Sequence, residues 1–61
     1  MAKKLIKLPQ VMSMTALSRP TIYNYMKDGR FPRQAKLGPR NVAWNQEEVE
    51  AWIVEKLNQR I

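Results

Sequence analysis

The stretch LSRPTIYNYMKDGRFP, residues 17–32, carries the start, the body and the end of one short helix. Ser18 can accept a hydrogen bond from the free backbone N–H groups of the helix that follows it. Gly29 can take the left-handed conformation that closes a helix, and Pro32 prevents the helix from resuming. We therefore predict a helix over residues 19–28, capped by Ser18 and ended by Gly29.

This predicted helix has one apolar face and one polar face. At about 100° per residue, with Ile22 and Met26 at the centre of the buried face, Asn24 points almost directly away from the protein. Thr21 and Lys27 flank it. In a DNA major groove an asparagine can bond adenine, a threonine can contact a thymine methyl, and a lysine can bond guanine or phosphate. Any surface helix shows polar residues, so this helix alone does not separate a DNA reader from a solvated surface.

A second helix and a tight turn precede this segment. Pro9 suits the first turn of a helix, and Val11 with Met14 forms an apolar pair three residues apart. We predict a helix over residues 9–14, followed by a very short connection, which gives the order of a helix-turn-helix. Residues 5–8, LIKL, are too few to classify by their periodicity.

A predicted β-hairpin follows the polar helix. Residues 34–44 alternate between apolar and polar side chains on either side of the turn GPRN. The hairpin tip carries Arg40, with Lys36 and Arg33 nearby. Such a hairpin can act as a wing that lays Arg40 against the DNA backbone or into a minor groove.

A third helix is predicted over residues 46–57, because Asn45 and Glu48 have capping-box spacing and an apolar stripe follows them. We expect a mainly α fold with a small β-hairpin, a winged helix-turn-helix, in a single domain of 61 residues. The predicted core consists of Val11, Met14, Leu17, Ile22, Met26, Phe31, Leu37, Val42, Trp44, Val49, Trp52 and Ile53.

Positive charge is concentrated in one part of the chain. Residues 1–44 contain nine lysines and arginines against a single acid, Asp28, whereas residues 45–61 contain two basic residues and four acids. A basic surface also occurs on proteins without an anionic partner, but charge gathered in this way favours a polyanion. Together with the helix-turn-helix order, it favours double-stranded DNA as the partner.

The composition argues against several classes of protein. The chain has no cysteine and no histidine, which excludes disulfides and the usual zinc sites, and we expect no cofactor. The acids Glu47, Glu48 and Glu50 lie at a helix start, where capping explains them, and we do not expect an enzyme. We expect no signal peptide, because the basic residues MAKKLIKLPQ lack its long apolar stretch, and no run approaches the roughly 20 apolar residues of a membrane span. We expect a cytoplasmic, nucleoid-associated protein without membrane contact.

Residues 5–53, from LIKLPQVMSMTALSRP to NQEEVEAWI, resemble the AlpA-type family of small phage and prophage regulators, related to MerR-like winged-helix proteins and small excisionases. The motifs LSRPTIYNYMKDGRFP, KLGPRNVAW and EEVEAWI carry the resemblance. It implies a winged helix-turn-helix protein that binds DNA. Such a protein would regulate integrase expression or act as a recombination directionality factor that favours excision of a mobile element.

The resemblance places candidate DNA-binding residues on two elements. Those of the recognition helix are Ser18, Arg19, Thr21, Tyr23, Asn24 and Lys27. Those of the wing are Lys36, Arg40 and Asn41, and Arg33 precedes them. Two positions depart from the family pattern. Ala16 stands where relatives often have glycine, and Pro20 cannot donate a hydrogen bond to a base or a phosphate.

One helix and one wing reach only a few base pairs, and each mismatched pair typically costs about 1–3 kcal/mol. We therefore expect a monomer in solution that assembles cooperatively on neighbouring DNA sites and bends the DNA between them. Neighbouring copies and an integrase or other recombinase are the expected protein partners. The residues do not separate an excisionase from a transcription regulator. The alternative function is a non-catalytic basic adaptor that binds a protein or an anionic surface.

Overall fold

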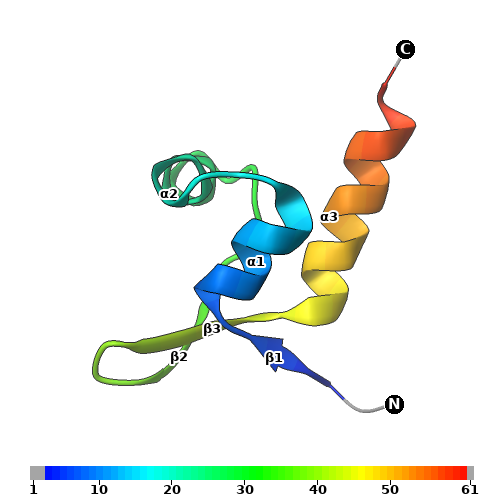
Figure 1. The fold of residues 1–61 in the computed structure, drawn as a ribbon. Coiled ribbons are helices and arrows are strands. Elements are labelled where there is room, and N and C mark those ends of the chain that lie inside the picture. Colours follow the sequence, from blue (N-terminus) through cyan, green and yellow to red (C-terminus); the bar gives the residue numbers. More distant parts are fainter. Residues whose placement is uncertain (1–2, 61) are drawn as a thin grey trace.

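Three helices and three short strands make up the computed structural model, which describes residues 3–60 (Figure 1). In chain order the elements are β1 (Leu5–Ile6), α1 (Leu8–Thr15), α2 (Arg19–Lys27), β2 (Ala35–Gly38), β3 (Asn41–Asn45) and α3 (Gln46–Asn58). The three predicted helices and the predicted hairpin differ from these bounds by one residue at one or both ends. The predicted fold class, a mainly α winged helix-turn-helix with a small hairpin, is confirmed.

The sheet contains a third strand, β1, that was not predicted. β1 pairs antiparallel with β3 and places Ile6 opposite Trp44, so the strand order is β1-β3-β2. β3 is therefore the central strand, with a hydrogen-bonded neighbour on each edge. This third strand ties the hairpin to the body of the protein at the side from which α1 starts.

β2 carries a bulge at Leu37. Lys36 pairs with Val42, and the next pair along the ladder is Gly38 with Asn41. Leu37 is thus an extra residue with no partner on β3, and a bulge interrupts the alternation of faces along a strand. The Leu37 side chain is 49% exposed. The prediction that Leu37 belongs to the core is wrong.

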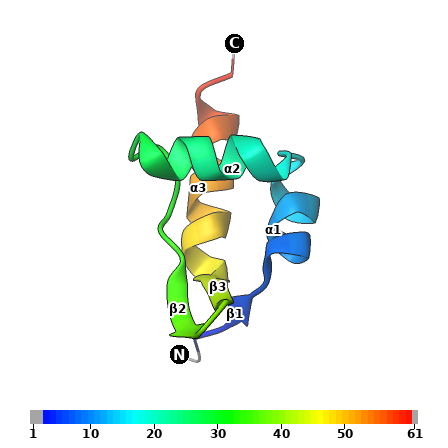
Figure 2. The same cartoon turned by 90° about the vertical axis from the view of Figure 1, so that its left-hand side faces the viewer.

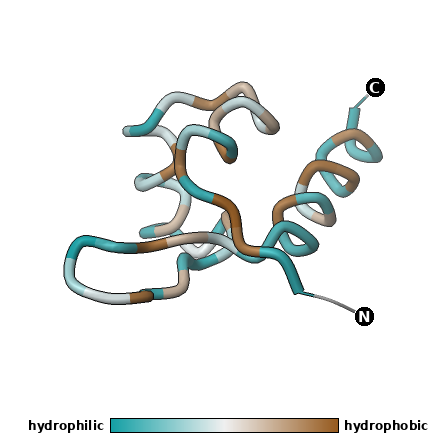
Figure 3. Tube along the Cα trace, turned by 60° about the horizontal axis from the view of Figure 1, so that its bottom comes forward, coloured by the Kyte–Doolittle hydropathy of each residue, from teal (hydrophilic) through white to brown (hydrophobic). Residues whose placement is uncertain are grey.

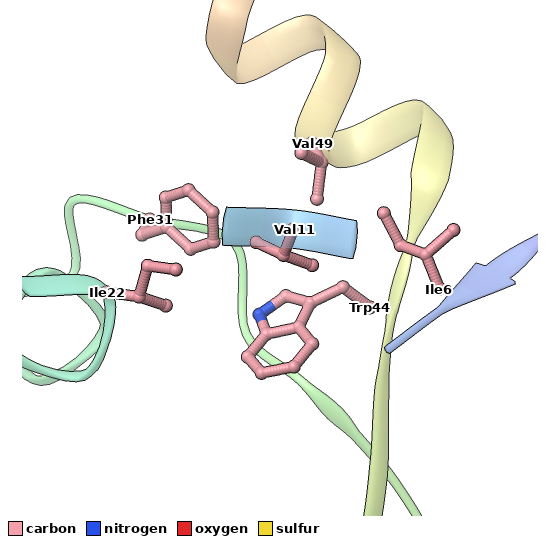
Figure 4. Packing of buried hydrophobic residues seen from close by; sticks show 6 residues of the cluster. All are labelled: Ile6, Val11, Ile22, Phe31, Trp44 and Val49. Carbon is pink, nitrogen blue, oxygen red and sulfur yellow. The ribbon is translucent and has the colours of Figure 1, made fainter. Parts of the chain in front are cut away.

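The core is a cluster of buried hydrophobic side chains from every helix and two of the strands (Figure 4). Its members within residues 3–60 are Ile6, Val11, Ile22, Phe31, Trp44 and Val49. All but Ile6 were predicted. The other predicted core residues apart from Leu37 are partly buried and pack against this cluster: Met14, Leu17, Met26, Val42, Trp52 and Ile53. In Figure 3 hydrophilic and hydrophobic residues alternate along α3, as expected of a helix with one buried side.

The two ends of α2 are formed by the residues predicted to form them. The Ser18 Oγ accepts a hydrogen bond from the backbone N–H of Thr21 at 3.4 Å. Gly29 has a φ of 74°, and the N–H of Arg30 donates to the carbonyl of Tyr25 at 2.8 Å, the bond that accompanies a left-handed helix ending. Local chemistry therefore fixes where α2 begins and ends.

The turn between α1 and α2 contains a strained residue. Ala16 has a φ of 61° and a ψ of 20°, and its N–H donates to the carbonyl of Met12 at 2.9 Å. Only glycine takes this left-handed conformation freely, and other residues lose about 1–2 kcal/mol. The Thr15 hydroxyl supports the turn by donating to the carbonyl of Val11 at 2.8 Å.

Ala16→Gly is expected to stabilise the fold by about 0.5–1 kcal/mol, because the relief of strain exceeds the entropy that glycine adds to the unfolded chain. The thermal midpoint, followed by circular dichroism, should rise by about 3–6 °C in a domain of this size. The control is Ala51→Gly on the exposed side of α3, which should destabilise the fold by about 1 kcal/mol. Shifts of the same sign in both variants would contradict strain at Ala16.

Candidate nucleic-acid interface

α2 and the β2–β3 hairpin project from the same side of the protein. Both lie on the left in Figure 1, and Figure 2 shows α2 crossing in front of α3 with the hairpin below it. α3 lies on the opposite side. We call the surface formed by residues 18–27 and 33–41 the α2–hairpin face.

The α2 residues predicted to bind DNA all reach the surface. The exposed ones are Ser18, Arg19, Asn24 and Lys27, and the half-buried ones are Thr21 and Tyr23. Ile22 is fully buried between them, so α2 turns its polar side outward, as the helical period predicts. The outward side offers hydroxyl, amide and cationic groups, which are the donors and acceptors that base edges and phosphates require.

Two hydroxyl groups lie together at the N-terminal end of α2. The oxygens of Ser18 and Thr21 are 2.8 Å apart, and Ser18 also accepts the Thr21 backbone N–H as the cap of the helix. The cap therefore holds the Thr21 side chain in place at the start of the helix. Because the Ser18 hydroxyl already forms these two contacts, it can form fewer hydrogen bonds with a ligand than a free hydroxyl can.

Tyr23 connects an exposed cation to the core. The Arg19 guanidinium carbon lies 5.9 Å from the centroid of the Tyr23 ring, and the Tyr23 ring meets Trp44 edge-on at 6.5 Å. Because Trp44 is fully buried, this stack restricts the directions that the Arg19 side chain can take. Arg19 is thus held beside the first turn of α2.

The acid that follows α2 is neutralised by its neighbour. Asp28 accepts from Arg30 at 2.8 Å, which is the single ion pair among residues 3–60. The Arg30 guanidinium also lies 4.8 Å from the centroid of the Tyr25 ring. With Asp28 occupied, the positive charge of Lys27 at the end of α2 is left unbalanced.

The hairpin tip is the turn Pro39–Arg40. Arg40 is exposed and has a φ of 58°, a left-handed conformation that strains a residue other than glycine. Lys36 is exposed on β2. Lys7, before α1, donates from Nζ to the Asn41 Oδ1 across 34 positions of sequence. Lys7 was not among the predicted residues, and its contact occupies the side-chain carbonyl of Asn41 within the protein.

Arg33 lies with α2 and not with the hairpin tip. It lines a hollow together with Gln34 and with three residues of α2, Tyr23, Met26 and Lys27. The predicted residues therefore fall into two groups on the α2–hairpin face, one along α2 and one on the hairpin, and Arg33 belongs to the first.

Negative charge lies away from the α2–hairpin face. Four of the five acids of the chain, Glu47, Glu48, Glu50 and Glu55, are on α3. Within residues 3–60 no group of histidine, cysteine, aspartate or glutamate side chains is placed to hold a metal ion. No helix in that range combines the length and the apolar character needed to cross a membrane.

One protein family and two relatives that are known by sequence are similar to this chain. The family of the prophage CP4-57 regulatory protein (AlpA) matches residues 4–57. The uncharacterized protein ORF88 of Enterobacteria phage P4 is 42% identical over 55 residues, which are 90% of this chain and 62% of the phage protein. The chain thus spans less than two thirds of that relative. The DNA-binding transcriptional activator AlpA of Escherichia coli (strain K12) is 30% identical over a matched length of 61. The match covers 90% of this chain and 87% of that protein.

Proposed function

The chain belongs to the prophage CP4-57 regulatory protein (AlpA) family, and from this premise we propose that it binds specific sequences in double-stranded DNA and regulates a prophage or integrative element. Its membership confirms the resemblance drawn from the sequence motifs. The observation that carries the proposal is the α2–hairpin face, which exposes amide, hydroxyl and cationic groups while most acids lie on α3. The activity is binding without catalysis.

α2 enters the major groove, with Asn24 bonding a base edge at the centre of the helix and Thr21 beside it. Arg19 and Lys27 contact base or phosphate at the two ends of the helix. The hairpin lies along the neighbouring backbone and directs Arg40 at a phosphate or into the minor groove. Further contacts are assigned to Ser18, Tyr23, Arg33, Lys36 and Asn41.

Selection of bound sequences from random duplex DNA at near-physiological salt tests this function. A DNA reader should enrich one preferred sequence. Enrichment of no sequence would favour the basic adaptor, because phosphate contacts alone bind all duplexes alike. The selected duplex also supplies the DNA for every binding measurement below.

Asn24→Ala should lose about 1–3 kcal/mol of discrimination at one base pair, because a bidentate amide contact specifies one base. Binding to variants of the selected duplex at each position measures this loss. The matched control is Asn58→Ala at the exposed end of α3, which should bind like the wild type. Equal discrimination in both variants would remove Asn24 from base reading.

Arg40→Ala should weaken binding and make the slope of log K against log salt less negative by about 0.9, because one phosphate contact releases about that many counterions. Lys56→Ala on α3 removes the same charge elsewhere and should change the slope much less. An unchanged slope in Arg40→Ala would remove the hairpin tip from the interface as a phosphate contact.

We further propose that several copies bind cooperatively at neighbouring sites and bend the DNA, since one copy reads too few base pairs for high specificity. Footprinting that finds one isolated, unbent site would contradict this. An assay of excision with the cognate integrase and its attachment sites separates the two regulatory roles. An excisionase should raise the yield of excised product, whereas a transcription regulator should leave it unchanged.

A further inference from the structure

A hollow of about 380 Å³ lies between the C-terminal half of α2 and the segment that leads into β2. Tyr23, Met26 and Lys27 line it from α2, and Arg33 and Gln34 line it from the following segment. A molecule of liquid water takes roughly 30 Å³, so the hollow has room for a phosphate group with some of its water. It brings together two cations and a tyrosine, which are groups that bind phosphate oxygens.

The two cations of the hollow are free to bind an anion. Neither Lys27 nor Arg33 forms an ion pair within residues 3–60, and the acid next to Lys27, Asp28, is held by Arg30 at 2.8 Å. The negative end of the α2 dipole lies near Lys27 and by itself would repel a phosphate. The two cations therefore decide whether an anion binds, and removing either should weaken its binding.

Gln34 has a polar atom that the free protein leaves unpaired. Its Oε1 is shielded from solvent and has no hydrogen-bond partner in the described part of the chain. Such a group lowers the stability of the state in which it stays unpaired. A phosphate accepts hydrogen bonds and donates none, so in the hollow it can bond only the amide N–H groups of Gln34 and not this oxygen. Gln34 therefore contributes amide donors to the lining that also holds the two cations.

The hollow lies between α2 and the segment that leads into the hairpin. In the proposed complex α2 and the hairpin reach adjacent grooves of the DNA. A sugar–phosphate backbone separates the two grooves of a duplex, so a backbone strand must run between α2 and the hairpin. We propose that the hollow seats one phosphate of this strand, bound by Lys27, Arg33 and Gln34. The inference rests on the proposed function, and it makes Gln34, which no sequence motif singles out, a DNA contact.

Neutral methylphosphonates, placed one at a time along the selected duplex, test this seat. Replacing the seated phosphate should lower wild-type affinity about tenfold, because charge-assisted hydrogen bonds are lost. In Arg33→Ala and Gln34→Ala the same replacement should lower affinity less than about threefold, because a partner is already missing. Arg33→Ala should also make the salt slope less negative by about 0.9, whereas Gln34→Ala should lower affinity at an unchanged slope, because glutamine is neutral.

Gln46 provides the matched control, because its Oε1 is also buried and unpaired but lies at the start of α3. Gln46→Ala should bind the duplex and respond to methylphosphonates like the wild type. Gln34→Glu keeps the size of the side chain, adds a negative charge and should bind more weakly than Gln34→Ala. If Gln34→Ala does not fold, Gln34→Glu replaces it in the methylphosphonate measurements.

Two failures can be told apart. If the selected duplex is bound, but every methylphosphonate lowers affinity in the Arg33 and Gln34 variants as much as in the wild type, the seat is wrong and the proposed function stands. If no duplex is selected at all, the proposed function fails and the seat fails with it.

Discussion

Trp44→Ala is expected to unfold a large fraction of the protein at 25 °C. The Trp44 side chain is 0% exposed and belongs to the central strand β3. Truncating a buried tryptophan to alanine costs about 3–5 kcal/mol, and the core of a domain this short rarely supplies more than about 3–5 kcal/mol of stability. The loss therefore equals most or all of the free energy of unfolding.

Trp44 also holds two neighbouring segments in place. Its Nε1–H donates to the carbonyl of Pro32 at 3.2 Å, which ties the segment after α2 to β3. Its ring also packs edge-to-face with the ring of Tyr23 in α2, with the two ring centroids 6.5 Å apart. Trp44→Phe keeps an aromatic ring but loses the N–H group, so it should destabilise the protein less than Trp44→Ala.

Urea unfolding followed by far-UV circular dichroism measures both variants. The comparison is Trp52→Ala, because Trp52 is only half-buried on α3 and should cost less free energy than Trp44. A larger loss in Trp52→Ala than in Trp44→Ala would place the centre of the core between α3 and the loop after α2, and not at β3.

The helices were predictable because their limits depend on nearby residues. Ser18 and Gly29 act on the backbone within a few positions of themselves, and both form the ends of α2 as the sequence indicated. The alternation of buried and exposed side chains around α2 follows from the helical period alone, so the burial of Ile22 and the exposure of Asn24 were also predictable. Such signals fix an element without reference to the rest of the chain.

The errors arose where pairing between distant segments decides the structure. β1 has two residues, too few for any periodic pattern, and it exists because Ile6 can lie opposite Trp44 of β3. Leu37 is exposed because a bulge changes the register of the hairpin, and a bulge has no signal in an alternating pattern. Strand pairing is set by contacts that the local sequence does not contain.

In the candidate site, too, features set by nearby residues were predicted and features set by distant contacts were not. The helical period predicted the residues that α2 turns outward, whereas the contact of Lys7 with Asn41 joins positions 34 residues apart and had no local signal. The placement of Arg33 and Gln34 beside Tyr23 likewise depends on how the segment after α2 packs back against the helix. Which of these residues contact DNA stays a prediction until the variants are measured.

Ile22→Ala is expected to lower the free energy of unfolding by about 2–5 kcal/mol, because it removes a 0% exposed side chain and leaves a cavity. Figure 4 shows Ile22 extending from α2 into the buried cluster beside Phe31. Ile22→Val removes one methylene and should cost about 0.5–1.5 kcal/mol. Asn24→Ala, two positions away on the exposed side, should leave the thermal midpoint close to that of the wild type.

The selected duplex should restore the fold of Ile22→Ala. A ligand that binds only the native state stabilises it by about 2.7 kcal/mol at a free concentration of 100 Kd, which offsets much of the loss. Circular dichroism with and without the duplex should therefore show helix regained on binding, and a duplex of unrelated sequence should restore less. If Ile22→Ala melts at the wild-type midpoint, Ile22 does not anchor α2. The physical reason for Asn24 to face the DNA would then be lost, because only the burial of the opposite side of the helix directs it outward.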